Sequence, residues 1–218
     1  MRTLVLSAHA DDAQIALGGT IVRMLEEDSH EIHYVGFSIC EESVPKGFPP
    51  DILDAECRKA CAELAVPANN VELRRYKVRH FPSKRQEILD DLIALRARIN
   101  PEIVFIPSTS DIHQDHAGLT SEAIRAFRRQ SSLYGYDFPW NVLHTGPLNL
   151  FVELTESHLA RKIVALSHLK SQLEKENNCL TEEYIRSLAV ERGNRIGARF
   201  AEALEVIREV KRAAHGLF

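Results

Sequence analysis

The chain has 218 residues, of which 44% are apolar and 27% charged, and its formal net charge is −4. This length and composition suit one globular domain with a substantial core, and the mild charge gives no reason to expect nucleic acid or an anionic membrane as the main partner. No apolar stretch approaches the ~20 residues of a membrane span, and without a signal-peptide layout ahead of the first apolar run we expect a cytoplasmic protein.

Short strands and helices alternate over the first 127 residues. In chain order, apolar spacing predicts a strand at residues 3–7, a helix at 17–27, a strand at 31–39, a helix at 53–64, a strand at 71–76, a helix at 82–99, a strand at 103–106 and a helix around 119–127. Such alternation predicts a parallel sheet with right-handed crossovers. We therefore expect an α/β fold, a single Rossmann-like domain over residues 1–218 with a mostly parallel twisted sheet flanked by helices.

The last third of the chain is less regular. Residues 131–146 are rich in aromatic and turn residues, and residues 148–154 have the pattern of a further strand. Helical spacing continues over residues 156–173 and again over 181–208, with an interruption near Gly193. In the second of these helices Ile196, Phe200, Leu204 and Ile207 would form an apolar stripe.

Four cysteines are too few for a disulfide scaffold at this length. Cys57 and Cys61 lie four residues apart in a predicted helix and could share a metal, but no second pair lies at zinc-finger spacing. Reduced, buried thiols are therefore the favoured interpretation, because free cysteine behaves as a small hydrophobe.

Two clusters of histidine and carboxylate side chains each follow a predicted strand. The first is Ala8-His9-Ala10-Asp11-Asp12, and the second is Asp111-Ile112-His113-Gln114-Asp115-His116. In the common strand order 3-2-1-4-5 the first and fourth strands are neighbours where the order reverses, and ligands bind at that point. We therefore expect the two clusters to form one site.

Imidazole and carboxylate ligands suit Zn²⁺, with Fe²⁺, Ni²⁺ or Co²⁺ as alternatives. A catalytic zinc site has three protein ligands and an open position for water, whose pKa falls to ~7. Consecutive side chains diverge, so one of Asp11 and Asp12 can bind the metal while the other faces the water. Asp12 lies three residues past His9, a spacing that suits a tight chelate, which leaves Asp11 as the general base.

The second cluster supplies the remaining groups. His116 completes a His-Asp-His ligand set, and a protonated His113 could stabilise an oxyanion and then protonate a leaving amine. Asp115 would hold His113 in its cationic form, because a nearby carboxylate raises a histidine pKa. The simpler alternative is that Asp12 and Asp115 only cap helices. Gly18-Gly19 is interpreted as allowing close helix packing.

At these residues the chain resembles the PIG-L/LmbE-like family of metal-dependent N-deacetylases, which act on N-acetylglucosamine-type sugars. The family's His-Pro-Asp-Asp-Glu motif, followed by Gly-Gly, is matched in part at residues 9–13 and 18–19, and its His-x-Asp-His motif is matched fully at residues 113–116. Later similarity is carried by Lys162, Ala165-Leu166, His168, Ser171-Gln172, Arg192-Gly193, Gly197 and Ala201-Glu202-Ala203.

The resemblance implies His9, Asp12 and His116 as metal ligands. It also implies Asp11 as the base and His113 as the electrostatic or acid partner, with Asp115 tuning it. These assignments agree with those made from the residues.

Two departures from the family pattern bear on the site. Ala10 and Ala13 replace the usual Pro and Glu, and Leu53 stands where many members have an arginine, three residues before the glutamate that matches Glu56. If that arginine helps to hold the sugar, this chain holds its substrate differently.

Substrate contacts are less specified. The aromatic segment that includes Trp140 is a candidate sugar-binding rim, with loop packing as the alternative, and Arg192 is a candidate for a substrate phosphate or carboxylate, with a surface salt bridge as the alternative.

The leading function is a zinc-dependent hydrolase that removes an N-acetyl group from an amino sugar or sugar conjugate. Alternatives are an amidase acting on a non-sugar N-acyl metabolite, a metal phosphoesterase, and a nucleotide-binding Rossmann-like module. A phosphoesterase needs more carboxylate ligands, and a nucleotide module needs a Gly-x-Gly-x-x-Gly turn that follows no strand here. The expected partner is a small N-acetylated molecule, and the sequence leaves the oligomeric state open, a homo-oligomer included.

Overall fold

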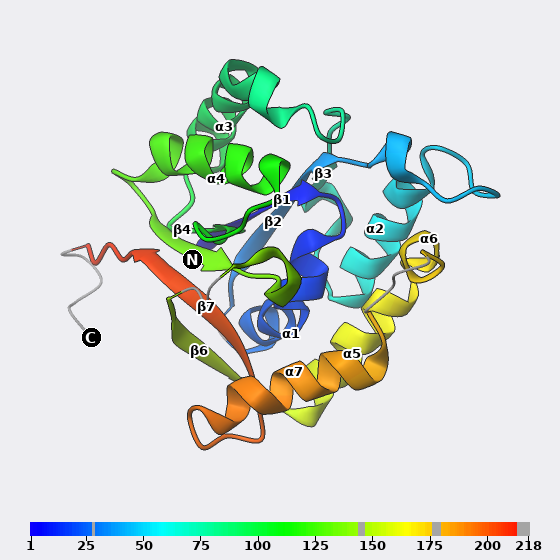
Figure 1. Ribbon diagram of the computed structural model, residues 1–218. Coiled ribbons are helices and arrows are strands. Elements are labelled where there is room, and N and C mark those ends of the chain that lie inside the picture. Colours follow the sequence, from blue (N-terminus) through cyan, green and yellow to red (C-terminus); the bar gives the residue numbers. More distant parts are fainter. Residues whose placement is uncertain (28, 144–146, 176–179, 213–218) are drawn as a thin grey trace.

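One mixed sheet organises the computed structural model, which describes residues 1–27, 29–143, 147–175 and 180–212 (Figure 1). Its strands are β1 (Arg2–His9), β2 (Glu31–Ser38), β3 (Val71–Leu73), β4 (Ile103–Pro107), β5 (Ser132–Tyr136), β6 (Leu148–Leu154) and β7 (Phe200–Arg208). They lie in the order β3-β2-β1-β4-β5-β7-β6. The first five are parallel, and β7 is antiparallel to both of its neighbours.

Helices cover both faces of this sheet. They are α1 (Asp12–Glu26), α2 (Ile52–Glu63), α3 (Arg85–Ile99), α4 (Gln114–Phe127), α5 (Glu156–Ser167), α6 (Lys170–Leu173) and α7 (Glu182–Asn194). One core cluster joins α1, α2, α5 and α7 to the sheet, and a second joins α3 and α4 to the opposite face (Figure 1). Along β1, Val5 belongs to the first cluster and Leu4 and Leu6 to the second, as expected for a strand buried on both faces.

The predicted strand order is confirmed over β3-β2-β1-β4-β5. β1 pairs with β4 through Thr3 and Ile103, so the loops that follow these two strands lie side by side. This is the reversal point at which a doubly wound sheet binds its ligands.

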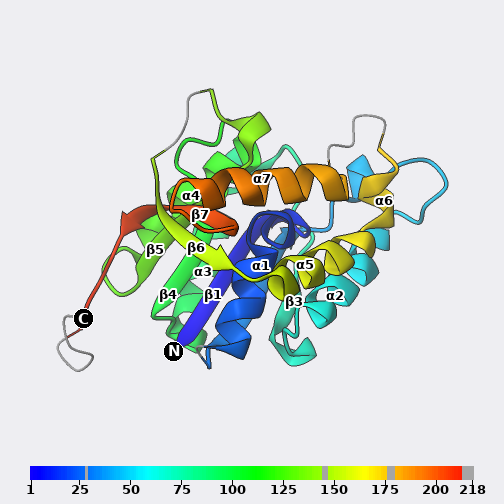
Figure 2. The ribbon, with the colours of Figure 1, turned by 90° about the horizontal axis from the view of Figure 1, so that it is seen from below.

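Close contact between α1 and its neighbours depends on the glycine pair. A Cβ at Gly18 would lie 2.7 Å from Cγ of Lys162, and one at Gly19 would clash with Cδ1 of Leu154. The interpretation of Gly18-Gly19 as a packing device is therefore confirmed. Figure 2 shows α5 running alongside α1 and α2 in this layer.

The prediction of one interrupted helix over residues 181–208 is wrong. The helix ends at Asn194, Gly197 adopts a φ of +73°, and Phe200–Arg208 forms β7. Positions 200, 204 and 207 satisfy helical spacing, but the first six residues of β7, Phe200–Glu205, are all buried because the strand is covered on both faces. The structure also contains β5 within the aromatic segment, where no strand was predicted, while residues 144–146 lie outside the described residues.

The remaining differences are small. The predicted helix over 156–173 is divided into α5 and α6, and the third strand ends at Leu73. Cys57 and Cys61 are free and buried in α2, as expected. None of the helices in the described part of the chain is both long and apolar enough to cross a membrane.

Candidate active site

His9, Asp11 and Asp12 lie where β1 passes into α1. Asp11 occupies the N-cap position of α1 without a side-chain capping bond, and Asp12 is the first helical residue. The Asp12 Oδ2 atom accepts a hydrogen bond of 2.7 Å from the backbone N–H of His9, which turns the carboxylate back toward the end of β1. Asp115 lies inside α4, and its carboxylate accepts bonds from Arg79 and Phe81 N–H groups of another loop. Neither carboxylate is a simple helix cap.

Buried hydrogen bonds hold the loop between β1 and α1 in place. The backbone carbonyl of Ala10 accepts from the Tyr34 hydroxyl at 2.8 Å and from the Cys57 thiol at 3.0 Å. The Ser7 hydroxyl accepts from Ala13 N–H and donates to Tyr34. These contacts fix the loop although Ala10 stands where the family pattern has a proline.

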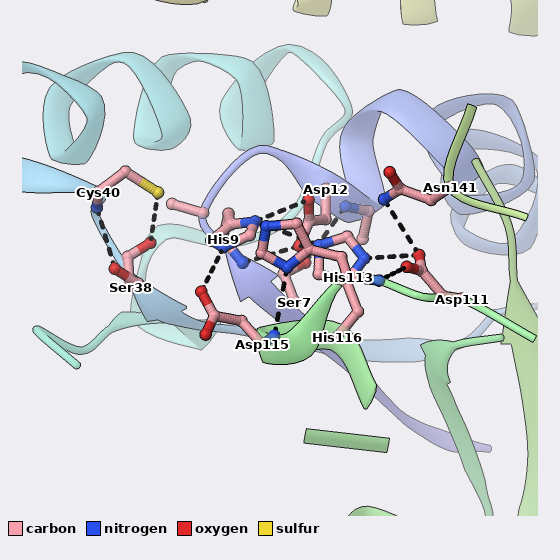
Figure 3. Close-up of polar contacts among 12 residues, drawn as sticks. Ser7, His9, Asp12, Ser38, Cys40, Asp111, His113, Asp115, His116 and Asn141 are labelled. Carbon is pink, nitrogen blue, oxygen red and sulfur yellow. Dashed lines mark hydrogen bonds and ion pairs between the residues drawn. The ribbon is translucent and has the colours of Figure 1, made fainter. Parts of the chain in front are cut away.

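Three side chains from the two clusters, His9, Asp12 and His116, converge (Figure 3). The His116 Nε2 atom lies 3.1 Å from His9 Nδ1 and 3.3 Å from Asp12 Oδ2, and His9 Nδ1 lies 3.5 Å from Asp12 Oδ1. Ligands bound at 2.0–2.1 Å to a tetrahedral zinc ion lie about 3.3 Å from one another. The donor types and their spacing therefore fit a divalent metal ion.

A second grouping shares two of these residues. The ring nitrogens of His9, His113 and His116 lie within 4.8 Å of one another. His113 and Asp12 are therefore both placed to complete a ligand set with His9 and His116.

His9 and His116, which belong to both groupings, each contact a second carboxylate through the ring nitrogen that faces away from Asp12. His116 Nδ1 lies 2.7 Å from Asp111 Oδ2, and His9 Nε2 lies 3.2 Å from Asp115 Oδ2 (Figure 3). Such outer carboxylates fix the tautomer and the ring orientation of metal-binding histidines. Asp111 was given no role from the sequence, although its place in the loop after β4, five residues before His116, was an available signal.

The surrounding carboxylates favour a positive charge between the rings of His9 and His116. Burial lowers the pKa of His9, but the carboxylates of Asp12 and Asp115 outweigh it and raise that pKa to about 9. Burial likewise lowers the pKa of His116, and Asp12 and Asp111 raise it to about 10. Burial raises the pKa of Asp12, but His116 and His9 hold it well below its usual range.

Asp11 and His113 border the same space. Burial and the negative charge of Asp12 raise the pKa of Asp11, which is the direction that makes a carboxylate a better proton acceptor near neutral pH. His113 caps α4, and its Nδ1 atom accepts from the backbone N–H of Asp115. In neutral His113 the proton therefore sits on Nε2.

Asp115 was expected to hold His113 in its cationic form, and its charge does raise the pKa of His113, but other groups outweigh it. The Asp115 carboxylate contacts His9 instead, while burial and the charges of His9 and His116 lower the pKa of His113. The charge of Asp115 opposes this shift without reversing it, so the neutral form of His113 is favoured.

These groups open into a pocket of about 360 Å³. It is lined by His9, Asp11, Asp12, Ile15, Cys40, Ser43, Val78, Arg79, His113, His116, Phe138, Trp140, Asn141, Gln172, Lys175 and Leu180. Trp140 is 46% exposed, and its ring lies 5.2 Å from that of Phe138, so this part of the aromatic segment borders the pocket as expected. Tyr136 instead belongs to β5 and is fully buried.

The expected substrate contact of Arg192 needs revision. Arg192 is 3% exposed and donates to Asp137 across 2.5 Å, so its guanidinium is used in a buried ion pair and is absent from the pocket lining. Leu53 is fully buried in the core, so the position of the family's arginine contributes no polar group here. Sequence reasoning missed the polar lining residues Arg79, Asn141 and Lys175, which come from loops outside the motifs.

A family model described as PIG-L, GlcNAc-PI de-N-acetylase, matches residues 4–127. Among solved structures, N,N'-diacetylchitobiose deacetylase from Pyrococcus horikoshii is similar with a TM-score of 0.78 and 21% identity, over 94% of this chain and 83% of that one. The zinc-inhibited form of teicoplanin deacetylase Orf2 has a TM-score of 0.74 and 16% identity, over 94% and 97%. GalB, the 4-carboxy-2-hydroxymuconate hydratase from Pseudomonas putida KT2440, has a TM-score of 0.74 and 20% identity, over 97% and 99%. At these identities the similarity establishes the fold.

Proposed function

Because the chain belongs to the PIG-L family, whose model is described as GlcNAc-PI de-N-acetylase, we propose that it is a metal-dependent hydrolase that removes an N-acetyl group from an amino sugar or sugar conjugate. The observation that carries the proposal is the convergence of His9, Asp12 and His116 at spacings of 3.1–3.5 Å, with a carboxylate behind each histidine. Relatives of the same fold that act on chitobiose and teicoplanin agree with it.

In the proposal His9, Asp12 and His116 hold the metal, and Asp111 and Asp115 orient the two imidazoles. Zn²⁺ is the preferred ion, and Fe²⁺, Ni²⁺ and Co²⁺ suit the same ligands. When bound, the metal supplies a Lewis acid that acidifies water and polarises an amide carbonyl.

The protein's own groups perform the proton transfers. Asp11 accepts a proton from the attacking water, and its raised pKa suits it to deliver that proton to the departing nitrogen. His113 in its neutral form presents an Nε2–H group that can donate to the carbonyl oxygen as negative charge develops there. Water and the amide thus yield acetate and a free amine, with Asp11 returned to its ionised form.

The rim of the pocket suits a sugar ring. Phe138 and Trp140 offer flat apolar faces at the entrance, and sugar rings pack against such faces while their hydroxyl groups bond to neighbouring polar side chains. Asn141 lies beside them and donates to Asp111 at 3.3 Å, which links the rim to the carboxylate behind His116.

The test is an acetate-release assay on purified protein, with the metal content measured in the same samples. N-acetylglucosamine glycosides are compared with N-acetyl amino acids, and the protein is assayed as purified, after chelation, and after return of Zn²⁺, Fe²⁺, Ni²⁺ or Co²⁺. We expect acetate release from a sugar, loss of activity on chelation, and recovery with metal. Full activity in a metal-free sample would overturn the proposal, as would release of acetate from the non-sugar compounds alone.

A further inference from the structure

Arg79 lies on the loop between β3 and α3 and lines the pocket beside the ligand histidines. Its backbone has a φ of +70°, in the left-handed region that disfavours residues with a Cβ atom. The backbone is held there from both sides, because Arg79 N–H donates to Asp115 Oδ2 at 2.6 Å and its carbonyl accepts from Gln114 Nε2 at 3.1 Å. These two contacts with α4 fix the Arg79 backbone in the wall of the pocket, so its side chain starts from a defined position.

The same oxygen of Asp115 receives both Arg79 N–H and the ring nitrogen of His9. Figure 3 shows this carboxylate below His9, joined to its ring by a dashed line. The position of Arg79 is therefore tied, through one carboxylate, to a proposed metal ligand. Such a link fixes the spacing between the Arg79 backbone and the reacting end of the pocket.

The guanidinium group of Arg79 is exposed and has no carboxylate partner among the described residues. It donates to the Ser43 hydroxyl at 2.7 Å, which uses one of its five N–H donors. Its neighbours differ in this respect, because Arg74 is paired with Asp91 and Arg75 with Glu41. Lys175 also lines the pocket, is exposed, and forms no ion pair within the described part of the chain.

We propose that Arg79, assisted by Lys175, forms an anion subsite that selects N-acetylated sugars carrying a phosphate or carboxylate group next to the sugar ring. The proposal rests on the proposed deacetylase function and adds the substrate class. Arginine suits this role because its planar donors match phosphate and carboxylate oxygens in pairs, and a flexible lysine adds a second positive charge. Arg192 does not contribute to this subsite, because its guanidinium group is used in the buried ion pair with Asp137.

The test compares the binding of one anionic and one neutral sugar by calorimetry. The probes are N-acetylglucosamine 1-phosphate and methyl N-acetylglucosaminide, with the carboxymethyl glycoside as the carboxylate counterpart. Zinc-loaded protein carrying Asp11→Asn is used so that turnover is slowed by about 10²–10⁴-fold during the measurement. The ratio of the neutral to the anionic Kd should fall about 10- to 100-fold on Arg79→Gln, the loss expected for hydrogen bonds to a charged group. The substitution should weaken binding of either the 1-phosphate or the carboxymethyl glycoside more strongly, and the ligand whose affinity falls more identifies the preferred anion.

Two variants separate recognition from folding and from general charge. Arg79→Gly suits the φ of +70°, so it should lose the same preference while its Tm stays within about 3 °C of the parent. Lys77→Gln removes an exposed positive charge from the same loop, outside the pocket lining, and should keep the preference.

An unchanged ratio in Arg79→Gln, or an equal fall in Lys77→Gln, would overturn the subsite. The outcome for the proposed function is read separately. If the parent enzyme releases no acetate from either sugar but its binding still depends on Arg79, the deacetylase assignment fails and the anion subsite stands.

Discussion

Asp111→Asn is the most informative substitution outside the proposed ligands. The Asp111 carboxylate accepts hydrogen bonds from His116 Nδ1 at 2.7 Å, from the backbone N–H of His113 at 2.8 Å and from Asn141 Nδ2 at 3.3 Å. An asparagine has one acceptor oxygen, so its amide nitrogen must face one of these donors. If it faces His116, that ring must move its proton to Nε2, the nitrogen that the metal needs.

The short bond to His116 sets the magnitude. A hydrogen bond to a charged group contributes about 1.5–3 kcal/mol, which corresponds to a 10- to 150-fold loss of zinc affinity. This agrees with the 10- to 100-fold effects of outer-sphere residues in other metal sites. The assay is competition for Zn²⁺ against a chelator at fixed pH, with Tm measured in parallel. Asp90→Asn removes an exposed carboxylate from α3 and serves as the control. Affinity within twofold of the parent for Asp111→Asn would refute the reasoning.

Three further predictions address the base, the rim and the core. Asp11→Asn should retain zinc within a few-fold but lower kcat by about 10²–10⁴-fold, as for a lost general base, and loss of zinc from this variant would reassign the residue. Trp140→Ala should raise KM for the sugar several-fold at nearly constant kcat and Tm, because its ring is 46% exposed; a fall in kcat alone would contradict a rim role. Glu202→Ala should destabilise the fold by about 3–5 kcal/mol in urea, because Glu202 accepts from Lys162 Nζ at 2.6 Å and both side chains are buried; a loss below 1 kcal/mol would show that water or repacking compensates.

The convergence of His9, Asp12 and His116 was predictable because the two clusters follow neighbouring strands. His9 is the last residue of β1, and His116 lies in the first turn of α4, which follows β4. The parallel order that makes β1 and β4 neighbours follows from the alternation of strands and helices. The short spacing of Asp12 from His9 likewise limited how the first loop could fold. Both features could be predicted from the sequence, because the spacing of His9 and Asp12 is local and the order of the strands follows a general rule of topology.

The features that were missed depend on contacts between distant segments. Asp115 was predicted to act on His113, two residues away, yet its carboxylate contacts His9 and the loop at Arg79. Arg192 was expected at the substrate, but Asp137, 55 residues away, neutralises it within the protein. No pattern along the chain encodes such pairings.

The error at β7 has a different origin. A strand buried on both faces has no alternation of apolar and polar residues, so the spacing of Phe200 and Leu204 satisfied a helix equally well. The usable signal was Gly197, because a glycine with positive φ commonly ends a helix or begins a turn.

The central claim is that His9, Asp12 and His116 hold one metal ion. Anomalous diffraction from zinc-soaked crystals, recorded on both sides of the zinc absorption edge, tests it most directly. We expect a single peak about 2.0–2.2 Å from His9 Nδ1, His116 Nε2 and an oxygen of Asp12. A peak bound by His113 with Asp12 outside bonding distance, or no peak between these side chains at saturating zinc, would contradict the account.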